Sequence, residues 1–261
     1  MHYDIVIVGG GAGGLELAAR MGRKLGRKSG KERVLLIDRS SYHIWKPTLH
    51  EVAAGTLDAH QEGLSYSILG RANHFSFLLG DLDSFDPVAK RLNLKPIIGE
   101  GGKVLVPERG VTFTWGVLAI GSGSNLFGTP GAELAHLLER TEDAEAFHTR
   151  LLAAFMKASF SPEKTMSVAI VGGGATGVEL SAELIEAHRE LLGSLGSEQR
   201  FRLDIAIVEA APRILGGLPE KISDQATVAL SARACGSTPA PRSWRSMPTG
   251  WRPAWGISPP T

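Results

Sequence analysis

The chain has 261 residues, more than the roughly 100 to 200 of a single domain, and its 43% hydrophobic and 21% charged residues are typical of folded globular proteins. Its 28 Lys and Arg nearly balance 27 Asp and Glu, so the net charge of +1 gives no support for nucleic acid as a partner. The only cysteine, Cys235, excludes an intrachain disulfide, a redox cysteine pair and a thiolate zinc site.

Two further global features bear on location and on ligand class. No apolar run reaches the ~18 to 20 residues that span a bilayer, and the N-terminus lacks the basic and then apolar order of a signal peptide. We therefore expect a cytoplasmic protein. Glycine is abundant, with 32 residues gathered partly in short clusters, as phosphate-binding turns require.

The first 38 residues predict a βαβ unit. Residues 3–8 form an apolar, β-branched run that ends at a glycine cluster and is typical of a buried parallel strand. Good helix formers follow over 15–25, with apolar residues three or four apart, and a second apolar strand is expected over 33–37.

The turn inside this unit fits GxGxxG, with Gly9, Gly11 and Gly14 at the glycine positions. The first glycine permits a tight turn, the second lets the backbone approach a pyrophosphate, and the third allows close helix packing. The phosphates then lie at the helix N-terminus, where unpaired N–H groups favour negative charge. Asp38 at the next strand end is placed to bind an adenosine ribose. Together these features favour a nucleotide site over a glycine turn that is merely flexible.

The middle of the chain has a different texture. Short alternating runs between residues 75 and 121 predict a small antiparallel meander. A helical segment is expected over 141–157, and the polar stretch 159–164 is a candidate domain boundary.

The opening pattern then recurs, with a strand over 166–171, a glycine turn, a helix over 178–192 and a strand over 204–208. Gly172, Gly174 and Gly177 repeat the glycine positions, and Glu209 repeats the acid. A carboxylate here accepts from a free 2′-hydroxyl and repels a 2′-phosphate, which favours NADH over NADPH. Arg213 is the alternative, because a guanidinium can pair with that phosphate.

Two dinucleotide sites without a cysteine pair predict flavin chemistry. A nicotinamide delivers a hydride, and a second dinucleotide that can accept it is most simply a flavin. We therefore expect NADH and FAD as cofactors with an external electron acceptor. No metal-ligand set is recognised among the histidines, so no metal site is predicted.

The chain resembles the type II NADH dehydrogenases, single-subunit FAD-dependent NADH:quinone oxidoreductases, over roughly residues 3 to 234. The most specific stretches, besides the first glycine turn, are HIWKPTLHEVAAG at 43–55, VLAIGS at 117–122, GTPG at 128–131 and AIVGGGATGVEL at 169–180. Disulfide reductases have a redox cysteine pair where this sequence has Trp45-Lys46-Pro47, and sulfide:quinone reductases also need cysteines.

The resemblance implies an α/β fold with two Rossmann-like dinucleotide-binding domains of the pyridine nucleotide-disulfide reductase type, the second incomplete. The expected domains are an FAD-binding domain over 1–160 with a small antiparallel insertion at about 75–115, and the first half of an NADH-binding domain over 165–234. Residues 235–261 are expected to be a non-homologous, disordered tail. The family's later segments are not found after Ala234, so we expect a chain truncated or frameshifted there.

The resemblance also implies roles for individual residues. Lys46 and Glu179 are the implied catalytic residues: Lys46 belongs to the segment that approaches the flavin ring, and Glu179 matches an acid near the nicotinamide and the quinone entrance. A first-turn helix acid is the structural alternative for Glu179, and a rigid surface loop is the alternative for residues 45–47. The implied FAD site comprises Gly9, Gly11, Gly14, Asp38, Lys46, Pro47, Ala119 and Gly121. The implied NADH site comprises Gly172, Gly174, Gly177 and Glu209.

The implied function is respiratory NADH:quinone oxidoreduction without proton pumping, with NADH and a quinone as partners. Family members are peripheral on the cytoplasmic face of the inner membrane, mainly through C-terminal helices not found here, and a homodimer is left open. Two alternatives remain. One is a nucleotide-binding fragment with impaired catalysis, and the other is an NADH-dependent ferredoxin or rubredoxin reductase.

A basic run over residues 20–33 contains seven Lys and Arg and one acid. Such a run usually forms the solvated end of a helix, and the alternative is contact with anionic lipid.

Overall fold

The computed structural model describes residues 1–234, and their contacts divide them into two compact units. Unit 1 comprises residues 1–49 and 58–141, and unit 2 comprises residues 50–57 together with the described residues from 142 onward. The tail predicted over 235–261 lies outside the described residues.

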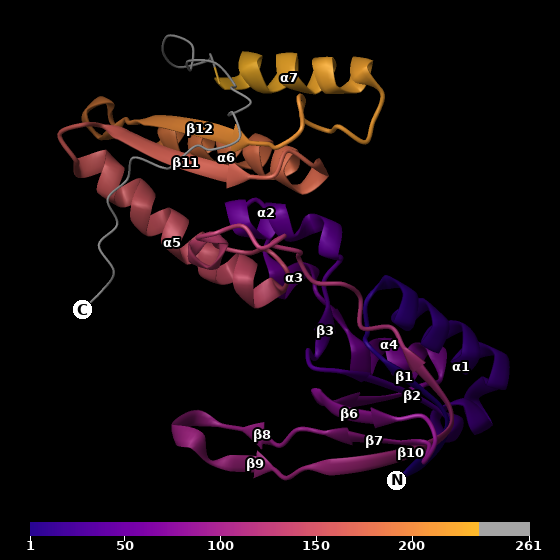
Figure 1. Cartoon of the computed structure of the whole chain (residues 1–261). Coiled ribbons are helices and arrows are strands. Elements are labelled where there is room, and N and C mark those ends of the chain that lie inside the picture. The colour runs from indigo at the N-terminus through magenta and orange to yellow at the C-terminus, as the bar shows by residue number, and fades with distance from the viewer. Residues whose placement is uncertain (235–261) are drawn as a thin grey trace. The chain divides into compact units, whose positions relative to one another are not determined.

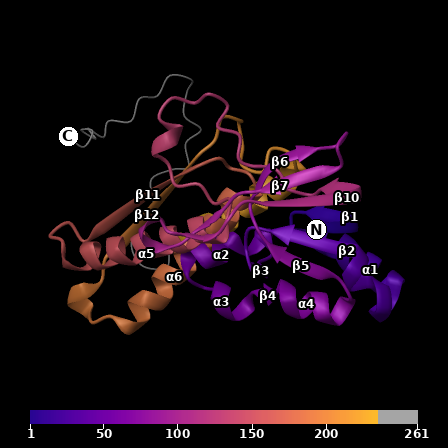
Figure 2. The ribbon, with the colours of Figure 1, turned by 90° about the horizontal axis from the view of Figure 1, so that it is seen from below.

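Unit 1 contains a six-stranded sheet in the order β5-β2-β1-β10-β7-β6, which can be followed in Figure 2. Strands β5, β2, β1 and β10 are parallel to one another. Strand β7 pairs antiparallel with β10 on one side and with β6 on the other. The strands span β1 (His2–Val8), β2 (Val34–Asp38), β5 (Ser76–Leu79), β6 (Leu82–Asp86), β7 (Arg91–Leu94) and β10 (Arg109–Leu118).

Of the remaining elements of unit 1, α1 and α4 pack against this sheet (Figure 1). The helices are α1 (Ala12–Arg33), α3 (Ala59–Glu62), α4 (Tyr66–Asn73) and the 3-10 turns η1 (Lys46–Thr48), η2 (Glu100–Gly102) and η3 (Ala132–Leu134). The strand pairs are β3 (Tyr42–His43) with β4 (Leu64–Ser65), and β8 (Ile97–Ile98) with β9 (Val104–Val106).

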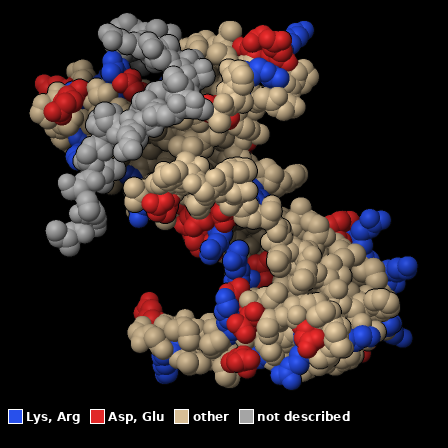
Figure 3. All heavy atoms as spheres, viewed as in Figure 1, with Lys and Arg blue, Asp and Glu red and all other residues tan. Residues whose placement is uncertain are grey.

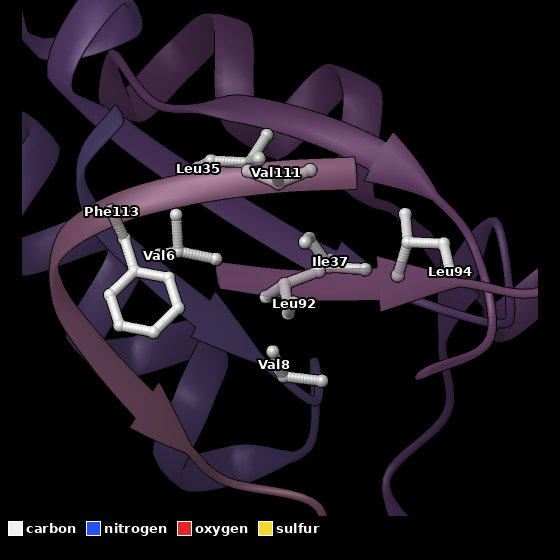
Figure 4. Packing of buried hydrophobic residues seen from close by; sticks show 8 residues of the cluster. All are labelled: Val6, Val8, Leu35, Ile37, Leu92, Leu94, Val111 and Phe113. Atoms are coloured by element: carbon white, nitrogen blue, oxygen red, sulfur yellow. The ribbon is translucent and has the colours of Figure 1, made fainter. Parts of the chain in front are cut away.

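The sheet of unit 1 has a buried cluster on each face, which explains why its central strands are continuously apolar. One cluster contains Ile7, Leu36 and Phe75 and packs against α1 and α4. The other is shown in Figure 4 and consists of Val6, Val8, Leu35, Ile37, Leu92, Leu94, Val111 and Phe113. Alternate residues of β1 and β2 therefore enter opposite clusters, as the period of a strand requires.

The expected meander over 75–121 differs from the structure at both ends. β5 pairs in parallel with β2, from Leu35 opposite Ser76 to Asp38 opposite Leu79. β10 is parallel to β1 on one side and antiparallel to β7 on the other. Alternation within a short strand indicates half burial but carries no information about the direction of its partner.

Helix α1 is longer than the 15–25 segment predicted from the sequence, and it is interrupted at Gly26, whose φ is +74°. Glycine adopts this left-handed conformation without the steric cost that a Cβ imposes. Lys and Arg side chains gather over α1 in Figure 3, and Arg27, Lys28 and Lys31 are exposed. Their exposure agrees with a solvated basic helix end.

Unit 2 is built around two parallel strands that pair over seven residues each, β11 (Thr165–Val171) and β12 (Arg202–Val208). Helix α6 contacts both strands and also α7. The other elements of the unit are α2 (Leu49–Ala54), α5 (Thr141–Phe160), α6 (Ala175–Ser194), η4 (Ser197–Gln199) and α7 (Glu220–Ala234).

An aromatic cluster in unit 2 joins α5, α6 and the residue that precedes β12. Phe155 of α5 lies 6.2 Å from the His188 ring of α6 and 5.4 Å from the Phe201 ring, and the His188 and Phe201 rings meet edge to face at 4.9 Å. These contacts explain why α5 groups with unit 2, although the domain boundary expected from the polar stretch lies after it. The polar stretch 159–164 indicates only that these residues are expected to be exposed, whereas the two units are defined by contacts between residues.

Buried His188 predicts a pH-dependent stability for unit 2. Burial lowers the pKa of His188 from 6.5, although a hydrogen bond with the Phe201 carbonyl oxygen at 3.0 Å opposes this shift. A lowered pKa means that the neutral ring contributes stability above pH 6.5, and that this contribution is lost as the pH falls. We expect the melting temperature to fall more steeply from about pH 7.5 to 5 in the wild type than in His188→Phe. Parallel pH profiles would contradict this assignment.

Candidate functional site

The first glycine turn, between β1 and α1, has the geometry that its sequence motif predicts. Gly9 has φ +104°, and a Cβ on it would lie 2.3 Å from the Ala119 carbonyl oxygen. A Cβ on Gly14 would lie 1.9 Å from the Gly9 carbonyl oxygen, so the helix packs directly on the turn. A Cβ on Gly11 would meet nothing within 4 Å. The backbone at Gly11 thus faces open space that a ligand can approach.

Asp38 at the end of β2 holds this turn in place. Its carboxylate accepts hydrogen bonds from the backbone N–H of Gly10 at 2.6 Å and of Ser40 at 2.8 Å. A carboxylate has about four acceptor sites, so two remain for a ribose.

Tyr66 of α4 is a site residue that the sequence analysis missed. Its hydroxyl donates to the Gly10 carbonyl oxygen at 2.7 Å, and its ring occupies the space that a Cβ on Gly10 would need. Burial, with a smaller effect from the Asp38 carboxylate, raises the pKa of Tyr66, so the phenol stays protonated and remains a donor. A single tyrosine in the sequence gives no local signal of this contact.

The second glycine turn, between β11 and α6, repeats the first. Gly172 has φ +109°, and a Cβ on Gly177 would lie 2.1 Å from the Gly172 carbonyl oxygen. A Cβ on Gly174 would meet nothing within 4 Å, as at Gly11. The two turns therefore share both the close helix contact and the open position.

Glu209 repeats the role of Asp38, since it accepts from the backbone N–H of Gly173 at 2.6 Å and of Ala211 at 2.8 Å. The N–H of Ala211, and to a smaller extent that of Gly173, holds the pKa of Glu209 below its usual range, although burial opposes this. The residue therefore stays ionised at neutral pH.

Arg213 is engaged elsewhere, which bears on its predicted alternative role as a phosphate partner. Its guanidinium donates to the carbonyl oxygens of Leu215, Gly216 and Leu218 at 3.3, 3.1 and 2.8 Å. These contacts close the loop after β12, so the arginine serves as a backbone clamp in this structure.

Both helices begin at an open N-terminus. Gly11 and Gly174 are the N-cap residues of α1 and α6, neither has a side-chain cap, and neither helix has an acid in its first turn. The first N–H groups of each helix are therefore not capped by a side chain, and the helix dipole favours an anion there. Pyrophosphate is the ligand that this arrangement suits best.

Lys46 lies near the C-terminal end of β10, where residues 119–122 begin. Its ammonium donates to the Ser122 carbonyl oxygen at 3.1 Å, and Pro47 stands within the first turn of η1. Ala119 donates from its N–H to the Val8 carbonyl oxygen at 2.7 Å, and Gly121 has φ +71°. The structure thus places the predicted Lys46 segment beside the predicted Ala119–Gly121 segment within unit 1.

Glu139 was also missed by the sequence analysis. Its carboxylate accepts from the Ser124 N–H at 2.7 Å, and this bond holds the pKa of Glu139 below its usual range, with a smaller contribution from the charge of Lys46. The negative charge near Lys46 follows from the fold of the 122–139 loop and has no sequence signature.

Glu179 lies in unit 2 on α6, near the helix end at the glycine turn. Its side chain is half exposed, and its Oε2 lies 3.6 Å from Nδ1 of His50 on α2. Because α6 has no acid in its first turn, Glu179 is not the first-turn acid of the structural alternative.

The residues present fit two dinucleotides. Each unit offers a glycine whose Cβ would stand in open space, an uncapped helix N-terminus and a carboxylate with free acceptor sites. Among the described residues, no group of three or more His, Cys, Asp or Glu is arranged to hold a metal ion.

Comparison with known proteins identifies the family. Residues 3–234 match the family described as pyridine nucleotide-disulphide oxidoreductase. The chain belongs to this family. The match covers both glycine turns, and it confirms the predicted α/β fold class with two dinucleotide-binding units.

Relatives of this family member carry more specific names. The type II NADH:quinone oxidoreductase of Haemophilus influenzae is 40% identical over 238 residues, covering 84% of this chain and 53% of that protein. An external alternative NAD(P)H-ubiquinone oxidoreductase B2 of Arabidopsis thaliana is 32% identical over 202 residues, covering 73% of this chain and 34% of that protein. The resemblance to type II NADH dehydrogenases is confirmed, and the chain spans about a third to a half of the length of the curated relatives it matches.

Solved structures agree with the fold. NDH2 from Plasmodium falciparum in complex with NADH superposes with a TM-score of 0.73 at 22% identity, covering 89% of this chain and 46% of that chain.

No helix within residues 1–234 has both the length and the apolar composition needed to cross a membrane.

Adjacent glycines of α1 provide a matched test of the turn geometry. Gly14→Ala places a methyl group 1.9 Å from a backbone oxygen, whereas a Cβ on Gly13 would meet nothing within 4 Å. We expect Gly14→Ala to destabilise unit 1 by several kcal/mol, and Gly13→Ala to be neutral or to stabilise it by about 0.5–1 kcal/mol through helix propensity. Thermal unfolding followed by circular dichroism compares the two variants. Equal melting temperatures would contradict the close packing of α1 on its turn.

Proposed function

We propose that this chain is an FAD-dependent NADH:quinone oxidoreductase that does not pump protons. The observation that carries the proposal is the duplicated site, in which each glycine turn is held by its own acid, Asp38 or Glu209. The Trp45-Lys46-Pro47 segment stands beside the first site, and one cysteine leaves no dithiol relay. The name of the Haemophilus influenzae relative supports quinone as the acceptor.

We propose that unit 1 binds FAD. Gly9, Gly11 and Gly14 provide the turn for its pyrophosphate, and Asp38 offers acceptors to its ribose. Four further residues line the region where the flavin ring would be held, namely Lys46, Pro47, Ala119 and Gly121. Bound there, FAD supplies the chemistry of accepting a hydride and passing electrons on.

We propose that unit 2 binds NADH in preference to NADPH. Gly172, Gly174 and Gly177 provide the second pyrophosphate turn, and ionised Glu209 suits a free 2′-hydroxyl. Because the guanidinium of Arg213 is engaged by backbone carbonyls, it is not positioned as a 2′-phosphate partner.

Two side chains are proposed to act on the reaction directly. Lys46 brings a fixed positive charge to the flavin segment, and its bond to the Ser122 carbonyl oxygen orients that charge. Glu179 exchanges a proton near the nicotinamide and the quinone, since half of its side chain is exposed. We propose a cytoplasmic protein that meets its quinone at the membrane surface; a homodimer is compatible with this proposal.

The first test is an anaerobic absorbance titration of the chain, reconstituted with FAD, against NADH. We expect the flavin absorbance to bleach with NADH and to recover on adding a soluble quinone. A folded chain that does not keep FAD would contradict the proposal. FAD that is retained but not bleached would identify a nucleotide-binding protein without turnover. If the flavin absorbance recovers with ferredoxin or rubredoxin and not with quinone, the electron acceptor is an iron–sulfur or rubredoxin-type protein and the quinone proposal is wrong.

Nucleotide preference is a second prediction. We expect Glu209→Gln to weaken NADH binding and to narrow the NADH over NADPH preference by roughly tenfold, because a neutral amide no longer repels a 2′-phosphate. Fluorescence titration of unliganded chain with each nucleotide measures both constants. Glu186→Gln on α6 is the control, since Glu186 pairs with Arg189 and not with the turn. An unchanged preference in Glu209→Gln would exclude Glu209 as its determinant.

A further inference from the structure

The imidazole of His50 lies between two carboxylates within unit 2. Its Nδ1 is 3.6 Å from Glu179 Oε2, and its Nε2 is 3.9 Å from Glu51 Oε1. The His50 side chain is only 11% exposed, whereas that of Glu179 is 49% exposed. Each ring nitrogen therefore faces one acid, and Glu179 is the more exposed of the two acids, at 49% against 34% for Glu51.

The other polar groups near this cluster have different contacts. From α6, Glu183 accepts a hydrogen bond from the Thr56 hydroxyl at 2.7 Å. From α5, His148 packs against Gly55, where a Cβ would lie 2.1 Å from the ring Cε1. These contacts hold residues 50–57 against α5 and α6. Glu51 and Glu179 are therefore the two acids within 4 Å of the His50 ring.

We propose that His50 is a positioning residue that holds and returns the proton exchanged by Glu179, and that Glu51 orients its ring. The inference rests on the proposed function, because it deepens the role given there to Glu179. The arrangement follows the general logic in which one group exchanges the proton, a second shares it and a third orients the second. Histidine suits the middle position because its ring has two nitrogens, one facing each acid.

The proton balance of the proposed reaction requires such a group. A hydride carries two electrons and one proton from NADH, whereas a quinol differs from its quinone by two electrons and two protons. One proton per turnover must therefore come from water. In the proposed step the Nδ1–H bond of His50 breaks, an O–H bond forms on Glu179, and Glu179 releases the proton toward the acceptor. Exchange with solvent through the half-exposed Glu179 then restores the imidazolium.

The distances from the His50 ring to the two acids, 3.6 and 3.9 Å, are longer than hydrogen bonds. Hydrogen bonds that serve catalysis are often long before the substrate binds, and they shorten in the complex.

The first arm of the test uses the chain without FAD, nucleotide or quinone. Melting temperatures are measured for wild type, His50→Gln, Glu179→Gln and the double variant at about pH 6 and pH 9. At pH 6 we expect Glu179→Gln to lower the melting temperature by about 1–3 °C when His50 is present and to have no effect in the His50→Gln background. The reason is that the ion pair between His50 and Glu179 requires a protonated imidazole. At pH 9 the two backgrounds should agree. Additive effects at both pH values would overturn the pairing.

The second arm separates proton exchange from structure. The FAD-loaded chain is reduced with NADH and reoxidised by rapid mixing with a quinone or with ferricyanide, which takes electrons without protons. We expect His50→Gln to leave the bleaching by NADH within about twofold and to slow the quinone step at least about tenfold, with ferricyanide reoxidation unchanged. His2→Gln, at the exposed start of β1, is the control for both acceptors.

The outcomes distinguish the inference from the function on which it rests. Wild-type chain that NADH does not bleach would overturn the proposed function and the role of His50 together. Normal bleaching with equal quinone rates in His50→Gln and wild type would overturn the role of His50 alone. Equal slowing with quinone and ferricyanide would show a structural effect and would also overturn it. Selective restoration of the quinone step in His50→Ala by added imidazole would support the exchange.

Discussion

Both units depend on one interaction, the hydrogen bond from a glycine-turn N–H to a carboxylate at the end of the neighbouring strand. Asp38 accepts from Gly10, and Glu209 accepts from Gly173, each at 2.6 Å. Each bond ties the turn to the second strand, so the helix N-terminus, the open glycine and the acid keep fixed relative positions. A dinucleotide site needs all three, because the phosphate and the ribose belong to one covalently linked ligand and must be bound at the same time.

The same carboxylates have two roles, which explains the choice of residue at these positions. An amide at position 38 or 209 retains one acceptor oxygen with two lone-pair sites but loses the charge and the other two sites, so the turn and the ribose then compete for that oxygen. The ionised state of Glu209 is favoured by the N–H groups that it organises. In unit 2, Glu209 therefore both holds the glycine turn and is the proposed determinant of nucleotide specificity. The positive charge of Arg213 stays on the loop after β12, because its guanidinium donates to backbone carbonyl oxygens there.

Unit 2 includes residues 50–57, although the residues on both sides of this segment in the chain belong to unit 1. Residues 50–57 follow the Lys46 segment directly, yet they pack against α5 and α6, which begin about 90 to 120 residues later. Through this packing His50 meets Glu179, and Thr56 meets Glu183. The chemistry proposed for Glu179 thus depends on a contact between segments that are distant in the chain.

Short-range periodicity and turn chemistry are enough to predict the two βαβ units, the glycine positions and the acids at 38 and 209, and the residue list alone shows the absence of a dithiol. Packing of distant segments produces the parallel pairing of β5, the cover that Tyr66 provides for Gly10, the engagement of Arg213 and the meeting of His50 with Glu179. These features depend on which residues, far apart in sequence, become neighbours. Local propensity carries no information about such neighbours, since packing of the whole unit selects them.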